Sequence, residues 1–272
     1  MSARVYIKIC DSGWIIEKMA RQLAERIPGV EYGLSDRFDV PLNYYMPYLT
    51  YATPGHRRAI GYFTHQEADA QRHRLFERSA TLFEQCVSHS VRYAEVLKRL
   101  GATRVSVISP GVDLGTFTPE IRIGIVGRTY DSGRKGEHLL AQMLDIPHIR
   151  WTCTGTGWPI ESTRLSDAEM PAFYRSMDYI LVTSLIEGGP MCVAEALACG
   201  TEVIAPNVGW VPEFPHIPYE TGNAESLRNV LQRVVQRRLD LRASVLSRTW
   251  DHWVTAHADL FDRLLSHPER HA

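Results

Sequence analysis

The stretch SLIEGGPMCVAEALACGTEVIAP, residues 184–206, predicts a turn, a helix and a strand in succession. Gly188 and Gly189 permit a tight turn, and Pro190 suits the first position of a helix because that position needs no backbone N–H. The apolar helix ends at Gly200, and TEVIAP is typical of a buried strand. A strand, a crossover helix and a further strand form the repeating unit of a parallel sheet.

The same alternation continues on both sides of this stretch. Extended apolar runs are predicted at RVYIKIC, VEYGLS, RRAIGYFTH, EQCVSHS, VSVISPGVD, IRIGIVGR, IRWTCTG and DYILVTS. Helices are predicted between them, among them residues 14–26, for which Ser12 is the expected cap. LNYYMPYLTY predicts only a strand end and a loop, because a proline interrupts it. Pro110 and Gly111 begin a stretch that is typical of a linker, so we predict two parallel α/β domains.

The composition restricts the classes of function. The 272 residues are 44% hydrophobic and carry 30 Lys and Arg against 31 Asp and Glu, so no global basic field attracts nucleic acid. A local basic groove remains compatible with these numbers. The sequence shows neither a signal-peptide pattern nor an apolar run long enough to span a membrane. The cysteines lack metal-ligand spacing, and we expect reduced thiols in a cytoplasmic protein. They are Cys10, Cys86, Cys153, Cys192 and Cys199.

In a parallel α/β sheet, ligands bind beyond the carboxyl ends of the strands, so the turns after strands are the candidate sites. In residues 184–206, backbone N–H groups near Met191 and Cys192 would form a helix N-terminus suited to phosphate. Glu195 lies five residues after Pro190 and is expected to bind neutral hydroxyls, such as a ribose diol. Glu187 ends the preceding strand and would face the same crevice. The alternative is a solvated Glu187 and a capping Glu195.

A second turn lies in VGRTYDSGRKGEHLL. Gly127 and Arg128 close a buried strand, and Lys135 follows Arg128 by seven residues. Arginine binds phosphate bidentately and lysine binds it as a point charge, so the two are expected to converge on a diphosphate. The alternative is a basic surface loop.

A third turn is CTGTGWP. Gly155 and Gly157 would let a planar base approach the backbone, and Trp158 would form a wall of its pocket. A short glycine pattern of this kind is weak by itself, and a plain strand-end turn is the alternative.

Taken in this order, VGR…RKG, TGTGWP and AFYRSMDYILVTSLIEGGPMCVAEALACGTEVIAPNVG resemble the donor half of retaining glycosyltransferases of the GT-B fold. The family is the large family 4, glycosyl transferases group 1, which includes sucrose and mannosyl transferases. Its hallmark is two glutamates eight positions apart around a glycine-proline turn, here Glu187 and Glu195. VISPGVDLGTFTP resembles the family's linker, and the resemblance is good over residues 87–209 and weak before them.

The resemblance implies an α/β GT-B architecture of two Rossmann-like domains that face a cleft. A shortened acceptor-side domain would span residues 1–112, and a nucleotide-sugar-binding domain residues 113–245. A final helix, residues 246–272, would pack back on the first domain. That helix carries Trp250, Trp253, His257 and Phe261 on one face, as expected of a buried stripe.

The resemblance also implies roles for individual residues. Arg128 and Lys135 would hold the donor diphosphate, Glu195 the ribose hydroxyls and Glu187 the hydroxyls of the transferred sugar. His65 matches a family histidine that contacts the sugar, although a histidine at a capped helix start is an equal alternative. The implied catalytic set is Glu187, His65, Arg128 and Lys135. The implied donor-binding set is Gly13, Gly127, Arg128, Lys135, Gly155, Gly157, Glu187, Gly188, Gly189, Pro190, Met191, Cys192 and Glu195.

The N-terminal residues depart from the family pattern. The family has a double glycine where this chain has Asp11-Ser12-Gly13-Trp14, and the domain before the linker is shorter. Gly13 is still expected near the donor phosphate. Asp11, Trp14 and His65 are the acceptor-side candidates, and a helix-start carboxylate is the alternative for Asp11.

The predicted function is therefore a retaining, metal-independent and cytoplasmic hexosyl- or pentosyltransferase. It would need no cofactor beyond its co-substrate, a nucleotide-diphosphate sugar, with UDP expected before GDP. The acceptor stays open among a glycan, a small natural product and a hydroxymethylated base in phage-type DNA. For DNA, a basic rim would be formed by Arg57, Arg58, Arg72, His73 and Arg74, and a solvated helix face is its alternative.

The sugar, the nucleotide and the oligomeric state also stay open at this point. Two rival functions remain. One is a non-catalytic module that binds nucleotide sugars without turnover, and the other is an epimerase or phosphorylase of the same fold.

Overall fold

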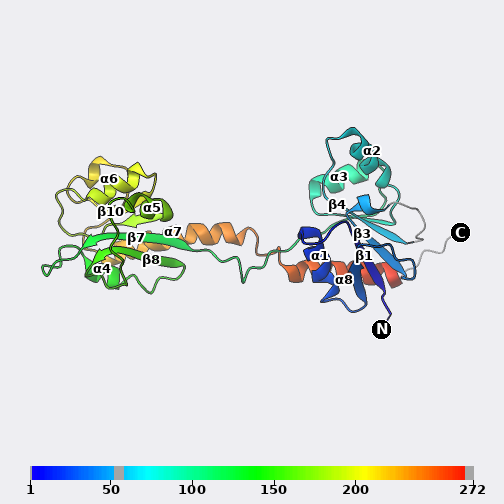
Figure 1. Cartoon of the computed structure of the whole chain (residues 1–272), viewed down its shortest axis with the longest axis horizontal. Helices are drawn as coiled ribbons and strands as arrows, with labels where there is room; N and C mark the ends of the chain where they lie inside the picture. The colour runs from blue at the N-terminus through cyan, green and yellow to red at the C-terminus, as the bar shows by residue number, and fades with distance from the viewer. Residues whose placement is uncertain (1, 52–57, 267–272) are drawn as a thin grey trace. The chain divides into compact units, whose positions relative to one another are not determined.

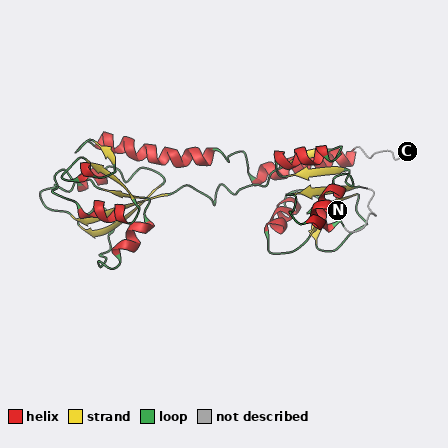
Figure 2. Ribbon diagram, turned by 90° about the horizontal axis from the view of Figure 1, so that it is seen from above, coloured by secondary structure: helices red, strands yellow, loops and turns green. Residues whose placement is uncertain are grey.

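The computed structural model describes residues 2–51 and 58–266. The chain forms two compact α/β units (Figure 1). Unit 1 comprises Met1–Phe117 and Val245–Ala272, and unit 2 is Thr118–Ser244. Each unit has its own parallel sheet, and Figure 2 shows helices flanking the strands of both.

Unit 1 contains a six-stranded sheet in the order β2-β1-β3-β4-β5-β6, and every described pair is parallel. The strands are β1 Val5–Ile9, β2 Val30–Gly33, β3 Leu42–Met46, β4 Ala59–Phe63, β5 Gln85–Ser88 and β6 Val105–Val107. The helices are α1 Ile15–Ala24, η1 Tyr48–Thr50, α2 Ala70–Ser79, α3 Val91–Arg99 and α8 Trp250–Ser266. Successive strand residues point to opposite faces, so Tyr44 packs with α8 while Tyr45 packs with α2 and α3.

Two local predictions for unit 1 were wrong. LNYYM is a fully buried strand between β1 and β4, because Pro47 follows its last residue and ends the strand instead of interrupting it. The N-cap residue of α1 is Trp14 and not Ser12, and Trp14 makes no side-chain cap. Instead, the backbone N–H of Gly13 donates to Glu17 Oε2 over 2.6 Å.

Unit 2 contains a five-stranded sheet in the order β11-β10-β9-β7-β8, again with parallel pairs. The strands are β7 Ile121–Arg128, β8 Ile149–Thr156, β9 Tyr179–Leu181, β10 Glu202–Pro206 and β11 Ile217–Tyr219. The helices are α4 Glu137–Ala141, α5 Met170–Ser176, α6 Met191–Ala198, η2 Val211–Glu213 and α7 Ala224–Ala243. The sequence did not predict β11, whose three residues are too short for a periodic pattern.

Helix α8 follows unit 2 in the chain but supplies part of the core of unit 1. Trp253 is completely buried and meets the Tyr62 ring edge-on at 6.0 Å, and Phe261 meets the Tyr44 ring at 5.9 Å. Val112 forms an isolated bridge with Thr249, which brings the two ends of the unit 1 chain together beside this helix.

His257, on α8, makes the stability of unit 1 depend on pH. Its ring is completely buried, with Nε2 3.1 Å from Tyr44 Oη and Nδ1 2.8 Å from the Trp253 carbonyl oxygen. Burial lowers the pKa of His257 to about 4. The unfolded histidine has a pKa of about 6.5, so below that pH the unfolded chain binds a proton that the folded chain does not. This contribution to stability is complete above pH 6.5 and falls as the pH drops toward 4.

We therefore expect unit 1 to lose about 2 kcal/mol of folding free energy between pH 6.5 and pH 5 through this residue. Urea unfolding followed by tryptophan fluorescence at both pH values measures the loss. His257→Gln should reduce the pH dependence, whereas His252→Gln, an exposed histidine on the same helix, should retain it. Equal pH dependence in the two variants would contradict the assignment.

Candidate functional site

The sheet of unit 2 has a topological switch point between β7 and β9. The chain adds β8 on one side of β7 and then crosses to β9 on the other side. Ligands of parallel α/β sheets bind beyond the carboxyl ends of the strands at such a point. The segments that leave β7 and β9 there are residues 129–136 and 182–190, which contain Lys135 and Glu187.

Hydrogen bonds to two backbone carbonyl oxygens fix these two segments against each other. The Leu185 N–H donates to the Arg134 carbonyl oxygen over 2.8 Å, and the Thr183 hydroxyl donates to the Lys135 carbonyl oxygen over 2.7 Å. Gly136 has a φ of 69°, and a Cβ added to it would lie 2.0 Å from the Thr183 carbonyl oxygen. Only glycine fits there, so the basic loop is held in one position over the end of β9.

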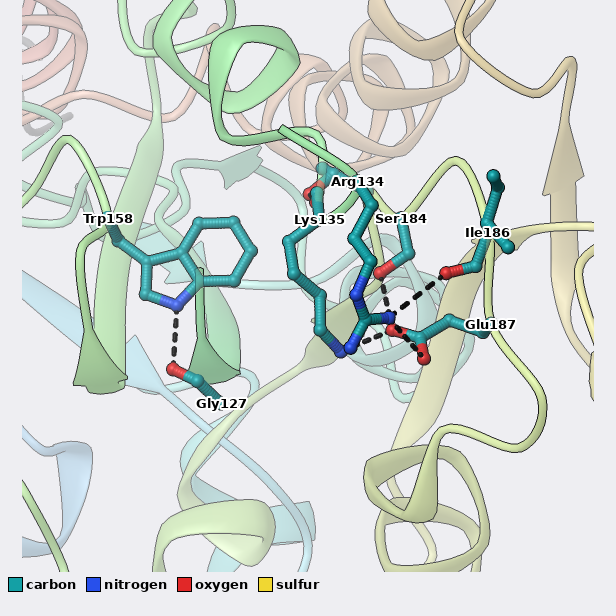
Figure 3. Close-up of polar contacts among 8 residues, drawn as sticks. Gly127, Arg134, Lys135, Trp158, Ser184, Ile186 and Glu187 are labelled. Carbon is teal, nitrogen blue, oxygen red and sulfur yellow. Dashed lines mark hydrogen bonds and ion pairs between the residues drawn. The ribbon is translucent and has the colours of Figure 1, made fainter. Parts of the chain in front are cut away.

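Figure 3 shows the charged cluster that results. Glu187 forms ion pairs with Lys135 and with Arg134, the latter over 3.4 Å, and accepts a 2.8 Å hydrogen bond from the Ser184 hydroxyl. The Glu187 side chain is only 9% exposed. Burial acts to raise its pKa, but the hydrogen bonds from Lys135 and Ser184 outweigh burial and lower the pKa below its usual value. The carboxylate is therefore ionised at neutral pH.

A tyrosine connects this cluster to Arg128. The Tyr130 ring lies 4.9 Å from the Arg128 guanidinium carbon and 4.2 Å from that of Arg134. Both guanidinium groups thus stack on one ring, as cations do on aromatic faces. The end of β7 and the loop that follows it therefore carry three cations, Arg128, Arg134 and Lys135. The sequence did not predict Arg134 as a site residue, although RKG at the start of α4 was a signal for it.

A cavity of about 440 Å³ lies beyond the ends of β7 and β8. Its lining includes four of the predicted donor-binding residues, Gly127, Arg128, Gly155 and Glu195. The lining also includes Arg164, which the sequence did not predict, because it lies in a loop without periodicity. Since Arg128 both lines the cavity and stacks on Tyr130, contacts connect the cavity with the charged cluster.

The two glycines of the third turn are required by close contacts within the protein. A Cβ on Gly155 would lie 1.6 Å from the Gly127 carbonyl oxygen, and one on Gly157 would lie 1.9 Å from Thr129 Oγ1. Trp158 donates from Nε1 to the Gly127 carbonyl oxygen over 2.8 Å (Figure 3) and packs on the core of unit 2. Trp158 is not among the residues that line this cavity, and its expected role as a wall of the base pocket stays a prediction.

The two glycines of the turn before α6 differ in whether there is space for a side chain. Gly188 has nothing within 4 Å of an added Cβ, whereas Gly189 would meet the Trp210 ring at 2.8 Å. Pro190 is the N-cap residue, with an extended ψ of 107°, and α6 begins one residue later than predicted, at Met191. Burial raises the pKa of the Cys192 thiol to about 12, so this thiol in the first turn stays protonated.

These glycines give a stability prediction. Gly155→Ala should lower the free energy of unfolding by more than about 2 kcal/mol, because the methyl group collides with backbone at a φ of 137°. Gly188→Ala is the matched control, since its methyl group meets no atom, and its Tm should stay within about 2 °C of wild type. Thermal unfolding measures both variants. An unchanged Tm for Gly155→Ala would contradict the close contact between β7 and β8.

The remaining predicted residues lie in unit 1, at the carboxyl ends of β1 and β4. Asp11 and Gly13 follow β1, which is the switch point of that sheet, and Trp14 is 72% exposed. The Gly13 N–H, expected near a phosphate, is bound to the chain's own Glu17 carboxylate. His65 is exposed, with Nδ1 3.0 Å from the Thr64 hydroxyl. The roles of these residues stay predictions.

Three of the basic residues considered for DNA, Arg58, Arg72 and His73, have acidic partners in the structure. Arg58 forms two hydrogen bonds with Glu84, of 3.0 and 2.6 Å, and Arg72 lies 3.4 Å from Glu67. Arg57 lies outside the described residues. These contacts favour the alternative of a solvated helix face with balanced charges.

The described ranges lack two features, a cluster of metal ligands and a membrane-spanning helix. Residues 2–51 and 58–266 contain no group of three or more His, Cys, Asp or Glu side chains placed to hold a metal ion. Of the helices in the part of the chain that the structure describes, none has the length and apolarity required to cross a bilayer.

The two parallel sheets confirm the predicted class, an α/β protein with two Rossmann-like units. Residues 120–237 match the family described as glycosyl transferases group 1, which confirms the predicted family for this segment. Over 183 residues the chain is 31% identical to a D-inositol 3-phosphate glycosyltransferase of Xylanimonas cellulosilytica, covering 49% of this chain and 43% of that one. It is 29% identical over 178 residues to the protein of that name from Pseudarthrobacter chlorophenolicus, covering 50% and 42%.

These matches span less than half the length of the curated relatives. Among solved structures, Alr3699/HepE of Anabaena in complex with UDP and glucose is 14% identical, with a TM-score of 0.43. The alignment covers 97% of this chain and 100% of that one. A likeness at this level supports no inference about the function of this chain.

Proposed function

We propose that this chain is a glycosyltransferase that moves a sugar from a nucleotide-diphosphate sugar to a hydroxyl acceptor, with retention of anomeric configuration. The observation that carries the proposal is that three cations, at the carboxyl end of β7 and in the loop after it, are connected through Arg128 with a cavity lined by Glu195. Both lie within the segment that matches the group 1 family. The family match supports the reaction class, and the charges and the cavity support the kind of donor.

The charges suit departure of a nucleoside diphosphate. When the bond between the sugar and the diphosphate breaks, negative charge accumulates on the phosphate oxygens. Arg134 and Lys135, fixed by backbone contacts, would stabilise that charge together with Arg128. An oxocarbenium-like sugar would then be attacked by the acceptor on the face that the diphosphate leaves, so the protein needs no nucleophile of its own.

Glu187 would change partners during this reaction. In the structure it forms ion pairs with Lys135 and Arg134. A donor diphosphate competes for the same cations, and the carboxylate that they release would accept hydrogen bonds from the sugar hydroxyls. Glu195 would accept from the ribose, since a carboxylate beside phosphate prefers a neutral partner.

The rest of the proposal concerns donor, acceptor and setting. UDP is the nucleotide expected first and GDP second, and the acceptor is a glycan, a small molecule or a hydroxymethylated base. The cations of the loop would replace a metal ion, so the reaction would be metal-independent. The five cysteines are free thiols, which supports a reducing, cytoplasmic setting.

A thermal-shift panel of UDP- and GDP-sugars, followed by mass spectrometry with pooled acceptors, tests the proposal. The expected result is a Tm increase with one donor class and an acceptor heavier by one sugar, also in the presence of EDTA. Proton NMR of the product would give the anomeric configuration. Binding without transfer would instead indicate a binding module, and release of a sugar phosphate a phosphorylase.

A further inference from the structure

Glu195 accepts a hydrogen bond from a buried tyrosine. Tyr174 Oη lies 2.5 Å from Glu195 Oε2, and the tyrosine, on α5, is only 1% exposed. Bonds from hydroxyl groups to carboxylates are short and strong because the acceptor carries a full charge. Burial first, and the bond to Glu195 second, raise the pKa of the Tyr174 phenol far above its ordinary value. The phenol therefore remains a hydrogen-bond donor at any working pH.

The position of the tyrosine is itself fixed. Its ring packs in a core cluster with Val193 and Ala196 of α6, and its carbonyl oxygen accepts a 2.8 Å hydrogen bond from the Thr201 hydroxyl. Tyr174 therefore holds one carboxylate oxygen of Glu195 in a defined place. Within the described chain, the other oxygen, Oε1, makes no hydrogen bond, and Glu195 lines the 440 Å³ cavity.

A comparison within unit 2 shows what is unusual about this contact. A buried tyrosine hydroxyl needs an acceptor, and a backbone carbonyl is sufficient. Tyr219 has that arrangement, because its hydroxyl donates to the Val182 carbonyl oxygen over 2.8 Å. Tyr174 instead uses a charged side chain that lines the cavity. The bond from Tyr174 therefore does more than satisfy the buried hydroxyl, because it also fixes the position of the Glu195 carboxylate.

We propose that Tyr174 is a positioning residue: it orients Glu195 so that the free carboxylate oxygen accepts from the ribose hydroxyls of the donor. The pair would then select ribonucleotides over nucleotides that lack these hydroxyls. The inference rests on the proposed function, since it requires a nucleotide in the cavity. Tyr174 itself would touch neither donor nor acceptor.

Calorimetry with UDP and with 2′,3′-dideoxy-UDP tests the inference on the full chain; GDP and its dideoxy analogue replace them if the panel selects GDP. Tyr174→Phe should weaken UDP binding about tenfold, the effect of losing a hydrogen bond to a charged group. It should leave binding of the dideoxy analogue within about twofold, since that analogue makes no contact with Glu195. Tyr219→Phe, which removes a buried hydroxyl elsewhere in unit 2, should change neither affinity.

The outcomes separate the inference from the proposed function. If Tyr174→Phe weakens both nucleotides equally, the tyrosine has a merely structural role, and unchanged binding of UDP would also overturn the inference. If wild type binds UDP and its dideoxy analogue equally, Glu195 does not bind the ribose and the inference fails, while sugar transfer would still support the proposed function. If wild type binds no nucleotide at all, the proposed function fails and the inference with it.

Discussion

Replacement of Lys135 by alanine is expected to lower kcat for sugar transfer about 100- to 1000-fold, the usual effect of removing one group that stabilises transition-state charge. Lys135 is the only lysine in residues 118–244, and the contact of its carbonyl oxygen with Thr183 fixes its place over the switch point. Arg134 and Arg128 remain in the variant, so donor binding should weaken much less than turnover. Steady-state kinetics with the selected donor measure both quantities.

Two further variants make this result specific. Lys98→Ala removes an exposed lysine that pairs with Glu95 over 2.9 Å in unit 1, and its kinetics should equal wild type. Lys135→Arg retains the charge but not the compact ammonium group, so its activity should lie between wild type and Lys135→Ala. Wild-type turnover in Lys135→Ala, with an unchanged Tm, would remove Lys135 from the proposed phosphate site.

Most of the fold could be predicted because the strands are buried on both faces, so that each strand is a nearly continuous run of apolar residues in the sequence. Ile123 and Ile125 of β7 pack in the core cluster on one face of the sheet. Ile180 of β9 and Val182, which follows that strand, pack in a second cluster. β3 and β11 were missed for local reasons. A proline directly after Met46 resembled an interruption, and three residues are too few to show a period.

The candidate site was predictable only where its signals are local in sequence. The glutamates around the glycine turn and the basic residues before α4 were visible as patterns. The contacts that join them are not, because the bond from Leu185 to Arg134 links segments about fifty residues apart, and only the order of strands brings them together. Tyr174 was missed because a buried tyrosine at helical spacing looks like any core residue.

The sequence also does not reveal why a glycine is required at a given position. The resemblance placed Gly127, Gly155 and Gly188 in the donor-binding set, whereas Gly136 was given no role. In the structure, Gly136 and Gly155 are required by neighbouring backbone, whereas Gly127 and Gly188 have open space where a side chain would be. A sequence pattern cannot separate these two reasons, because both select against a Cβ atom.

The ion pair of Glu187 with Lys135 has a consequence for ligand binding. The carboxylate holds the cation that a donor diphosphate would need, so part of the free energy of donor binding is used to separate the pair. Bound UDP and Glu187 therefore compete for Lys135 and Arg134. Removal of the negative charge from Glu187 should help the nucleotide and harm the transfer of its sugar.

Glu187→Gln is accordingly expected to bind UDP several-fold more tightly than wild type and to transfer sugar about 100-fold more slowly. The amide retains the shape of the side chain and can still accept from Ser184 and Lys135, so the loop should stay folded. However, it no longer offers a charged acceptor to the sugar or to the positive charge that develops on it. Calorimetry with UDP and kcat for the donor sugar measure the two effects.

The control for this variant is Glu202→Gln, because Glu202 is exposed at the amino end of β10, the opposite edge of the same sheet. It should bind UDP and transfer sugar as wild type does. If Glu187→Gln loses UDP affinity and turnover together, Glu187 serves to hold Lys135 in place and does not compete with the donor. Opposite signs for binding and transfer are the result expected if the carboxylate exchanges its cations for the sugar when the donor binds.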